Sequence, residues 1–379
     1  MKQDDQDETG WTRWLALSGF CTILVLLLPP VREFFFIEGI RWLYIFLLAF
    51  TTSLALTPVM IRLGRQWGLV DQPSERKIHR KPTPRIGGVA VYLGFAGAVL
   101  ANSVLLSDMG TILLAGSLLL VVGVWDDASE LPAWGKLAAQ MLASGLVIYS
   151  GVLLHLLPQG PVGNVINVFL TFLWIVGITN AFNFFDGMDG LAAGTAMLMA
   201  FFMGLVAYET DQPALAWLAV AITGASLGFF PYNFRTGQKP ALIFLGDGGS
   251  TFLGFTLACL AVKGNWADNN PIVSFSNPLL IFGVLIYDMI HITVERIVTG
   301  KVGTIKEWID YVGTDHLHHR LARVLGSKRA SVDVIFALTI CLGLSAIVLR
   351  NADTRDAILL LAQAALIVIL ITILERRAH

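Results

Sequence analysis

The stretch from Asn180 to Gly194, which reads N-A-F-N-F-F-D-G-M-D-G-L-A-A-G, holds a dense group of polar side chains between two long apolar runs. It brings Asn183, Asp186 and Asp189 together with glycines, which allow a ligand to approach the backbone closely. A carboxylate in hydrocarbon is costly, so such residues usually mark a polar cavity or a site. Their oxygens suit Mg²⁺, which also takes oxygens from substrate phosphates. The alternative is a polar loop between two helices.

A second group of chemically useful residues lies in W-D-D-A-S-E-L-P-A-W-G-K. Asp126 and Asp127 end one apolar run, and Lys136 begins the next. Adjacent carboxylates repel each other, and either a divalent metal or the Lys136 ammonium would offset that repulsion. The pattern therefore favours phosphate or metal chemistry, with helix capping at the membrane interface as the alternative.

Asp247 is surrounded by glycines in I-F-L-G-D-G-G-S-T, where a helix is expected to begin. The free N–H groups of a helix amino terminus attract anions. An aspartate beside them could hold a metal that bridges phosphates. The alternative is a glycine-rich turn in which Ser250 caps the helix.

The segment T-D-H-L-H-H-R-L carries three histidines and an arginine, His316, His318, His319 and Arg320. Such a group could bind the charge that develops on a diphosphate. Zinc is the alternative, but no cysteine lies nearby and the carboxylates of this chain suit Mg²⁺ better. The phosphate role is the favoured interpretation.

Two further polar segments lead to different interpretations. The loop from Asp71 to Gly88 either captures a phosphorylated lipid or nucleotide, or is a basic loop held near anionic lipid headgroups. Its cationic and histidine residues are Arg76, Lys77, His79, Arg80, Lys81 and Arg85. Near the end of a later apolar run, helical spacing predicts mutual pairing and structural roles for Asp288, His291, Glu295 and Arg296.

The composition shows what kind of chain must position these groups. Of its 379 residues, 55% are apolar and 14% are charged, and the mean hydropathy is +0.70. A soluble protein would carry about a quarter charged residues. The net charge of −1 gives no sign of nucleic-acid binding, and Cys21, Cys259 and Cys341 lie inside apolar runs without metal-site spacing. The acidic amino terminus indicates a retained helix rather than a cleaved signal peptide.

The apolar runs predict an all-α, polytopic membrane protein with about 11–12 transmembrane helices. We treat residues 1–379 as a single membrane domain, because no internal repeat is evident. The expected spans are 12–30, 39–63, 86–106, 110–125, 134–157, 162–182, 190–209, 212–231, 242–262, 274–298, 331–349 and 354–375.

The distribution of basic residues predicts the orientation of these spans. When both termini are placed on one face, only five of the 26 lysines and arginines fall on the other. Those five are Arg32, Arg41, Lys263, Arg350 and Arg355. The crowded face is expected to be cytoplasmic, and every polar cluster described above falls on it.

Taken in order, these motifs resemble the polyprenyl-phosphate N-acetylhexosamine-1-phosphate transferase family over about residues 40 to 325. The resemblance rests on D-Q-P-S-E-R-K-I-H with P-T-P-R-I-G-G, D-D-A-S-E-L with Lys136, the Asn180–Gly194 stretch, L-G-D-G-G-S and D-H-L-H-H-R-L. The family transfers a sugar-1-phosphate from a UDP-sugar to a polyprenyl phosphate with Mg²⁺, at the cytoplasmic face, and releases UMP. Mn²⁺ as an alternative ion and a homodimer are compatible with it.

The resemblance also implies roles for individual residues. Asp247 and Asn183 match the metal and diphosphate ligands, and Asp189 and Phe244 match the uracil site. The remaining matches are the paired aspartates Asp126 and Asp127, the phosphate-facing Lys136, and the pyrophosphate-binding His319 and Arg320. We add Asp186, His316, His318 and Arg85 as expected substrate-binding residues.

The form of two motifs narrows the expected substrate. D-H-L-H-H-R-L resembles the branch that starts O-antigen, teichoic acid or exopolysaccharide lipids with GlcNAc-1-phosphate, and F-F-D-G-M-D-G is bacterial in style. We therefore expect GlcNAc-1-phosphate transfer to undecaprenyl phosphate in a bacterial inner membrane. Another UDP-N-acetylhexosamine, or phospho-MurNAc-pentapeptide, is the alternative substrate. The departure from the family is the additional helix expected at 12–30.

The sequence leaves two mechanisms open, and it argues against two other classes of protein. The lipid phosphate could attack directly, with Asp126 or Asp127 accepting a proton, or one of these aspartates could form a phospho-enzyme. A transporter would place polar residues near mid-span in related halves, which this sequence does not do. A CDP-alcohol phosphatidyltransferase would carry a D-G-x-x-A-R run, which is absent.

Overall fold

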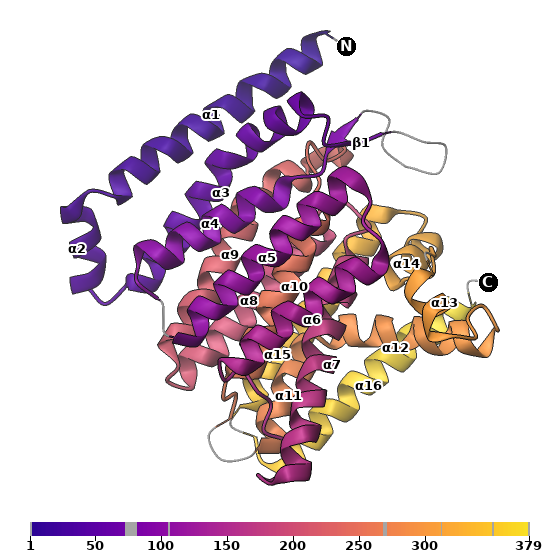
Figure 1. The fold of residues 1–379 in the computed structure, drawn as a ribbon. Helices are drawn as coiled ribbons and strands as arrows, with labels where there is room; N and C mark the ends of the chain where they lie inside the picture. Colours follow the sequence, from indigo (N-terminus) through magenta and orange to yellow (C-terminus); the bar gives the residue numbers. More distant parts are fainter. Residues whose placement is uncertain are drawn as a thin grey trace.

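The computed structural model describes residues 2–72, 82–104, 107–267, 271–311, 313–350 and 352–377. Within these residues the protein is a bundle of helices with one minimal β-ribbon, in which Val70 pairs with Pro84 and Asp71 with Thr83 (Figure 1). The elements are α1 (Lys2–Leu26), α2 (Pro29–Ile37), α3 (Arg41–Gln66), β1 (Val70–Asp71), β2 (Thr83–Pro84), α4 (Gly87–Ala101), α5 (Ser107–Ser129), α6 (Ala133–Tyr149), α7 (Pro161–Phe185), α8 (Leu191–Glu209), α9 (Pro213–Asn233), η1 (Thr236–Gln238), α10 (Gly246–Lys263), α11 (Pro271–Ile281), α12 (Gly283–Val298), α13 (Ile305–Asp310), α14 (Leu317–Leu325), α15 (Lys328–Leu349) and α16 (Thr354–Arg377).

The prediction of an all-helical, polytopic membrane protein is confirmed. Among the described residues, seven helices are long and apolar enough to cross a bilayer, and two bent helix pairs raise the number to nine. The spans expected at 86–106, 134–157 and 242–262 are also helices, α4, α6 and α10, although they fall outside those nine. α4 and α6 have only 15 and 17 residues, and α10 starts with a polar, glycine-rich turn.

Two expected spans are not straight. The span expected at 12–30 ends at Leu26, and α2 leaves it at an angle of 72° after two residues that precede the prolines Pro29 and Pro30. The continuous span expected at 274–298 is wrong, because α11 and α12 meet at Phe282 with a bend of 76°. Pro278 inside α11 removes a backbone donor, and such losses are a common cause of helix breaks.

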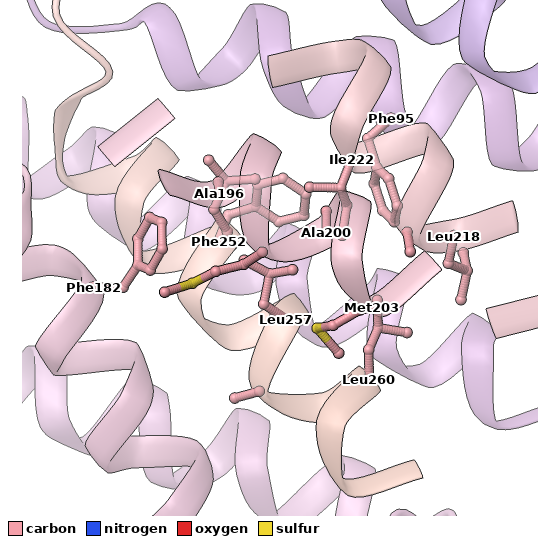
Figure 2. Packing of buried hydrophobic residues seen from close by; sticks show 14 of the residues in the cluster. Phe95, Phe182, Ala196, Ala200, Met203, Leu218, Ile222, Phe252, Leu257 and Leu260 are labelled. Carbon is pink, nitrogen blue, oxygen red and sulfur yellow. The ribbon is translucent and has the colours of Figure 1, made fainter. Parts of the chain in front are cut away.

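α10 is the central helix of the bundle and packs against α4, α5, α7, α8 and α9. Every residue from Gly246 to Val262 is buried except Asp247. A helix that is apolar on all sides is either covered by other helices or faces lipid, and α10 is covered by other helices. Figure 2 shows this packing, in which the rings of Phe95 and Phe252 lie 5.5 Å apart beside Phe182.

Glycines set how closely the neighbours of α10 approach. A Cβ on Gly88 would lie 2.1 Å from Cα of Gly249, and a Cβ on Gly123 would lie 2.4 Å from Cα of Gly248. Small residues of this kind allow the backbones of membrane helices to touch. The glycine-rich start of α10 therefore brings α4 and α5, and the polar residues at their ends, against Asp247.

Substitution of Gly88 by alanine is expected to lower the thermal unfolding midpoint of the detergent-solubilised protein, because the added methyl group forces α4 away from α10. Such overpacking costs about 1–3 kcal/mol. Gly97→Ala on the same helix is the matched control, since a Cβ there meets no atom within 4 Å. Equal unfolding midpoints for the two variants would contradict the close crossing of α4 and α10.

Candidate active site

The polar motifs expected on one face of the membrane meet at one end of the bundle. Asp126 and Asp127 lie in the last turns of α5, Asp186 directly follows α7, and Asp247 lies in the first turn of α10. We call these four residues the aspartate cluster. Three exposed tryptophans lie near helix ends at this end of the bundle: Trp67 directly follows α3, Trp125 lies in the last turns of α5, and Trp134 lies at the start of α6. Tryptophan is enriched at membrane–water interfaces, so this end is expected to lie at a membrane surface.

Asp247 is the residue on which the other motifs converge. Its Oδ2 lies 3.6 Å from Nζ of Lys136, and its Oδ1 accepts a hydrogen bond of 3.3 Å from Nδ2 of Asn183. The carboxyl group of Asp126 is also within hydrogen-bonding reach. Side chains from α5, α6, α7 and α10 therefore surround one carboxylate, which remains partly open to solvent.

Lys136 joins Asp126 to Asp247. Its Nζ donates to Oδ2 of Asp126 at 2.8 Å, while the other oxygen of Asp126 accepts the N–H of Leu131 at 2.6 Å. This closes the turn between α5 and α6 and places the ammonium between two carboxylates. The expected pairing of a cation with the D-D motif is thus present, through Asp126.

Asp127 faces a different part of the site. Its Oδ1 lies 4.0 Å from Nε of Arg85, and its Oδ2 accepts a weak hydrogen bond of 3.5 Å from the N–H of Gly248. Gly246 has a φ of +78°, and a Cβ there would lie 1.8 Å from the carbonyl oxygen of Arg85. This glycine allows the loop before α4 to lie directly on the start of α10.

Asp186 and Asp189 lie in the turn between α7 and α8. Burial raises the pKa of Asp186 to about 7, and the charges of Asp247 and Asp189 add to the effect. Oδ2 of Asp189 accepts the N–H of Ala241 at 2.9 Å, which ties this turn to the segment before α10. The half-buried Phe244 lies in that segment and exchanges backbone hydrogen bonds with Pro84 and Gly87.

The raised pKa of Asp186 predicts how stability depends on pH. The folded state holds the proton up to about pH 7, while the unfolded chain loses it near pH 4, so wild-type stability should fall as pH rises between these values. Asp186→Asn mimics the protonated group. In chelator-containing buffer it is expected to raise the thermal midpoint at pH 8 and to leave it nearly unchanged at pH 4. A midpoint at pH 8 no higher than that of wild type would contradict the half-buried, like-charged environment of Asp186.

The donor atoms of the site fit a hard cation such as Mg²⁺. They are carboxylate oxygens and an amide, without a thiolate or an imidazole. Among the residues that the structure describes, no group of three or more His, Cys, Asp or Glu side chains could hold a metal ion unaided. Mg²⁺ typically takes one or two carboxylates and completes its shell with water and substrate phosphates. Asn183 here donates to Asp247 and to Ser250, so it orients the carboxylate.

The histidine motif, Asp315–Arg320, packs against the end of α7 that leads to Asp186. The ring of His316 lies 5.6 Å from that of Phe184, and a Cβ on Gly187 would lie 2.3 Å from Nε2 of His318. Burial lowers the pKa of His318 well below its usual range, and burial also lowers that of His319. Both rings are therefore predominantly neutral near pH 7.

The members of the histidine motif differ in exposure. His318 is buried, and neither of its ring nitrogens makes a hydrogen bond, whereas His319 is only half-buried. His319 lines a cavity of about 450 Å³ together with basic and small residues of α14 and the following turn. The other lining residues are Thr314, Ala322, Arg323, Gly326, Ser327 and Lys328.

Arg320, expected from the resemblance to bind pyrophosphate, is buried in contacts within the protein. Its Nε donates to Oε2 of Glu375 at 3.0 Å, and its Nη1 donates to the carbonyl oxygen of Asp315 at 2.6 Å. Only 7% of its side chain is exposed. In this arrangement Arg320 stabilises the conformation of the histidine motif.

The expected mutual pairing of the four polar residues on α12 is confirmed for His291 and Glu295, which lie 3.5 Å apart. For the other two it is wrong. Asp288 accepts from Nδ1 of His316 at 2.8 Å, and Arg296 makes two bonds of 2.7 Å to Asp315. The bend at Phe282 turns α12 so that these side chains reach the histidine motif.

Sequence reasoning therefore missed Glu375, and it predicted structural roles for Asp288 and Arg296 but assigned them the wrong partners. Asp288 and Arg296 carried a signal, because charged residues on an apolar helix need partners, but the partners were assigned within the helix. Glu375 gave no signal beyond its place near the end of the chain. The roles predicted for the basic loop are not tested, because the following residues lie outside the described part of the chain: Arg76, Lys77, His79, Arg80 and Lys81.

Comparison with known proteins identifies relatives. The profile of glycosyl transferase family 4 matches residues 109–265. The chain is 34% identical over 319 residues to a probable undecaprenyl-phosphate N-acetylglucosaminyl 1-phosphate transferase of Bacillus subtilis, covering 83% of this chain and 86% of the relative. It is 32% identical to a decaprenyl-phosphate N-acetylglucosaminephosphotransferase of Mycobacterium tuberculosis, with coverages of 76% and 77%. An undecaprenyl-phosphate alpha-N-acetylglucosaminyl 1-phosphate transferase of Pasteurella multocida is 35% identical, with coverages of 78% and 82%.

Proposed function

Because the chain belongs to glycosyl transferase family 4, as a membrane-bound polyprenyl-phosphate sugar-phosphate transferase, we propose that it transfers GlcNAc-1-phosphate from UDP-GlcNAc to undecaprenyl phosphate and releases UMP. The observation that carries this proposal is the convergence of Lys136, Asn183 and Asp126 on Asp247. A partly exposed carboxylate beside an ammonium group suits the binding of a metal–diphosphate. The sugar and the carrier follow the names of the bacterial relatives.

Mg²⁺ held at Asp247, with Asp126 beside it, would neutralise charge on the diphosphate when bound. Lys136 lies next to both carboxylates. We assign its ammonium group to contact a phosphate oxygen as negative charge develops. We assign His319, which is half-exposed, as a hydrogen-bond donor to the same diphosphate. In this proposal the protein accelerates the reaction mainly by positioning these groups around the diphosphate, without a covalent intermediate.

The lipid phosphate attacks the sugar-linked phosphorus directly in the mechanism we favour. Its phosphomonoester is largely ionised near neutral pH, so proton removal by Asp126 or Asp127 contributes little. Asp126 is already engaged by Lys136 and by the N–H of Leu131, which suits a structural carboxylate better than a nucleophile. A radiolabelled phospho-enzyme that accumulates without lipid acceptor would contradict direct attack.

Uridine recognition is assigned to Asp189 and Phe244, at the loops that follow α7 and precede α10. The hydrogen bond from Ala241 to Asp189 holds these two loops together. A carboxylate can accept several hydrogen bonds, so we assign Asp189 to accept from the base edge as well. The half-buried ring of Phe244 offers a stacking surface. We assign Arg85, whose side chain is 38% exposed, to bind the nucleotide phosphate or the lipid phosphate.

We further propose that this end of the bundle faces the cytoplasm of a bacterium, because the Lys and Arg count favours it. The opposite end carries the ion pairs Asp108–Lys263 and Glu209–Arg350. Residues 1–379 act as one membrane domain in this proposal, and the additional helix α1 lies along α3 at one edge of the bundle (Figure 1).

The substrate is tested by supplying purified protein, undecaprenyl phosphate and Mg²⁺ with UDP-GlcNAc, UDP-GalNAc, UDP-MurNAc-pentapeptide and UDP-glucose in parallel. Mass spectrometry of the lipid fraction identifies which sugar-phosphate is attached. The proposal predicts a lipid-linked GlcNAc product at the highest rate. A faster reaction with another UDP-sugar would contradict the assignment of GlcNAc and leave the class of reaction intact.

A further inference from the structure

The carboxyl-terminal helix α16 combines an exposed body with a buried charge. Only 6% of its most apolar window is buried within the protein, the lowest fraction among the seven straight candidate spans of the described residues. Near its end, however, the side chain of Glu375 is 6% exposed. A buried carboxylate is costly unless a charged partner and hydrogen bonds compensate for the lost hydration.

The partner of Glu375 is Arg320 of the histidine motif, 55 residues earlier in the chain. The two side chains are about equally buried and are joined by a hydrogen bond of 3.0 Å. One turn before Glu375, Thr372 shares a hydrogen bond of 2.8 Å with the hydroxyl of Tyr287 on α12. The end of α16 is thus attached to α12 and α14 by polar contacts. Figure 1 shows α12, α14 and the end of α16 on the same side of the bundle.

Arg320 connects Glu375 to a histidine through Asp288. Nη1 of Arg320 lies 3.7 Å from Oδ1 of Asp288, and Oδ2 of Asp288 lies 2.8 Å from Nδ1 of His316. Asp288 also accepts the N–H of Leu317 at 2.6 Å, at the start of α14. A carboxylate bonded to Nδ1 fixes the ring orientation of His316 and favours the tautomer that leaves Nε2 free as an acceptor.

We propose that Glu375 is a positioning residue, which restrains Arg320 so that Asp288 remains bonded to His316. Without the charge of Glu375, the guanidinium would be left with Asp288 as its nearest carboxylate. It would then move across the 3.7 Å gap and compete with His316 for that carboxylate. The end of α16 therefore sets the geometry of the histidine motif, although α16 contributes no group to the aspartate cluster.

This inference rests on the proposed transferase activity, so its test combines a kinetic readout with one that needs no turnover. Glu375→Gln removes the charge with almost no change in size. Its kcat for UMP release is expected to fall about tenfold to a hundredfold, as for loss of other groups that orient a site residue. The KM for UDP-GlcNAc is expected to change by less than about threefold. Amide hydrogen exchange should accelerate in residues 313–325 in particular.

Two control variants separate this role from mere attachment of the helix. Thr372→Val removes the contact of α16 with Tyr287 but leaves the charge of Glu375. Glu209→Gln breaks a more exposed Glu–Arg pair at the opposite end of the bundle. Both should keep kcat within about twofold of wild type, since neither contacts the histidine motif. A loss for Thr372→Val as large as for Glu375→Gln would overturn the proposal.

A double-variant comparison tests whether Glu375 acts through Arg320. In an Arg320→Gln background, the further change Glu375→Gln should leave kcat unaltered, because the residue to be restrained is absent. The double variant Arg320→Gln/Glu375→Gln has no unpaired buried charge at this position. It can therefore still be measured if Glu375→Gln alone fails to fold. Additive losses, or unchanged exchange in residues 313–325, would overturn the inference. Inactive wild-type protein would count against the proposed function, and the exchange measurement would still test Glu375.

Discussion

Replacement of Asp247 by asparagine is expected to lower the rate of UMP release by about 10²–10³-fold at saturating substrate, the range found when one preorganised electrostatic group is removed. The asparagine has nearly the same shape, and it retains one oxygen to accept from Asn183. It lacks the charge that attracts Mg²⁺ and that balances Lys136. The loss therefore reports charge rather than packing.

The control for this variant is Asp108→Asn, which removes a carboxylate paired with Lys263 at the opposite end of the bundle. That variant is expected to keep the wild-type rate. Rates are measured as UMP formed by detergent-solubilised protein over a range of Mg²⁺ concentrations. An Asp247→Asn variant with more than about a tenth of wild-type activity would contradict a central role for this carboxylate.

Replacement of Lys136 by methionine is expected to separate catalysis from metal binding. The ammonium lies 2.8 Å from Asp126 and 3.6 Å from Asp247, so its removal leaves two neighbouring carboxylates without a protein cation between them. Attraction for a dication should then increase, because the positive charge that repelled it is absent. We expect the Mg²⁺ concentration for half-maximal activity to fall, while kcat falls about a hundredfold through loss of contact with the diphosphate.

Lys263→Met, which breaks the ion pair with Asp108, serves as the control and is expected to behave as wild type. The two variants are compared in Mg²⁺ titrations at saturating UDP-sugar and lipid. A higher Mg²⁺ requirement for Lys136→Met would contradict the placement of the ammonium beside the metal-binding carboxylates.

The meeting of the motifs could be predicted from sequence because of the alternation of helices. When successive helices cross a membrane, every second connection lies on the same face, and parity places Asp126, Asn183 and Asp247 together without knowledge of their contacts. The glycines around Asp247 also indicated a close backbone approach, and Gly248 and Gly249 do touch α5 and α4. The sequence alone was therefore enough to predict that these polar residues meet and that neighbouring helices approach closely there.

The environment of the histidine motif could not be predicted in the same way. It depends on the bend at Phe282, which turns Asp288 and Arg296 toward residues 315–316, and on a contact between Arg320 and Glu375 across 55 residues. Helical spacing predicts only neighbours on the same helix. A buried ion pair between distant segments leaves no periodic trace in either one.

The most direct test of the transferase mechanism follows the phosphorus itself. UDP-GlcNAc labelled with ³²P at the sugar-linked phosphate is incubated with purified protein, undecaprenyl phosphate and Mg²⁺, and the lipid is extracted. The account predicts that label appears in the lipid in equal amount to unlabelled UMP, and that Asp247→Asn slows the formation of both products by about 10²–10³-fold. Folded wild-type protein that leaves the label in the nucleotide, with this and with every other UDP-sugar, would contradict it.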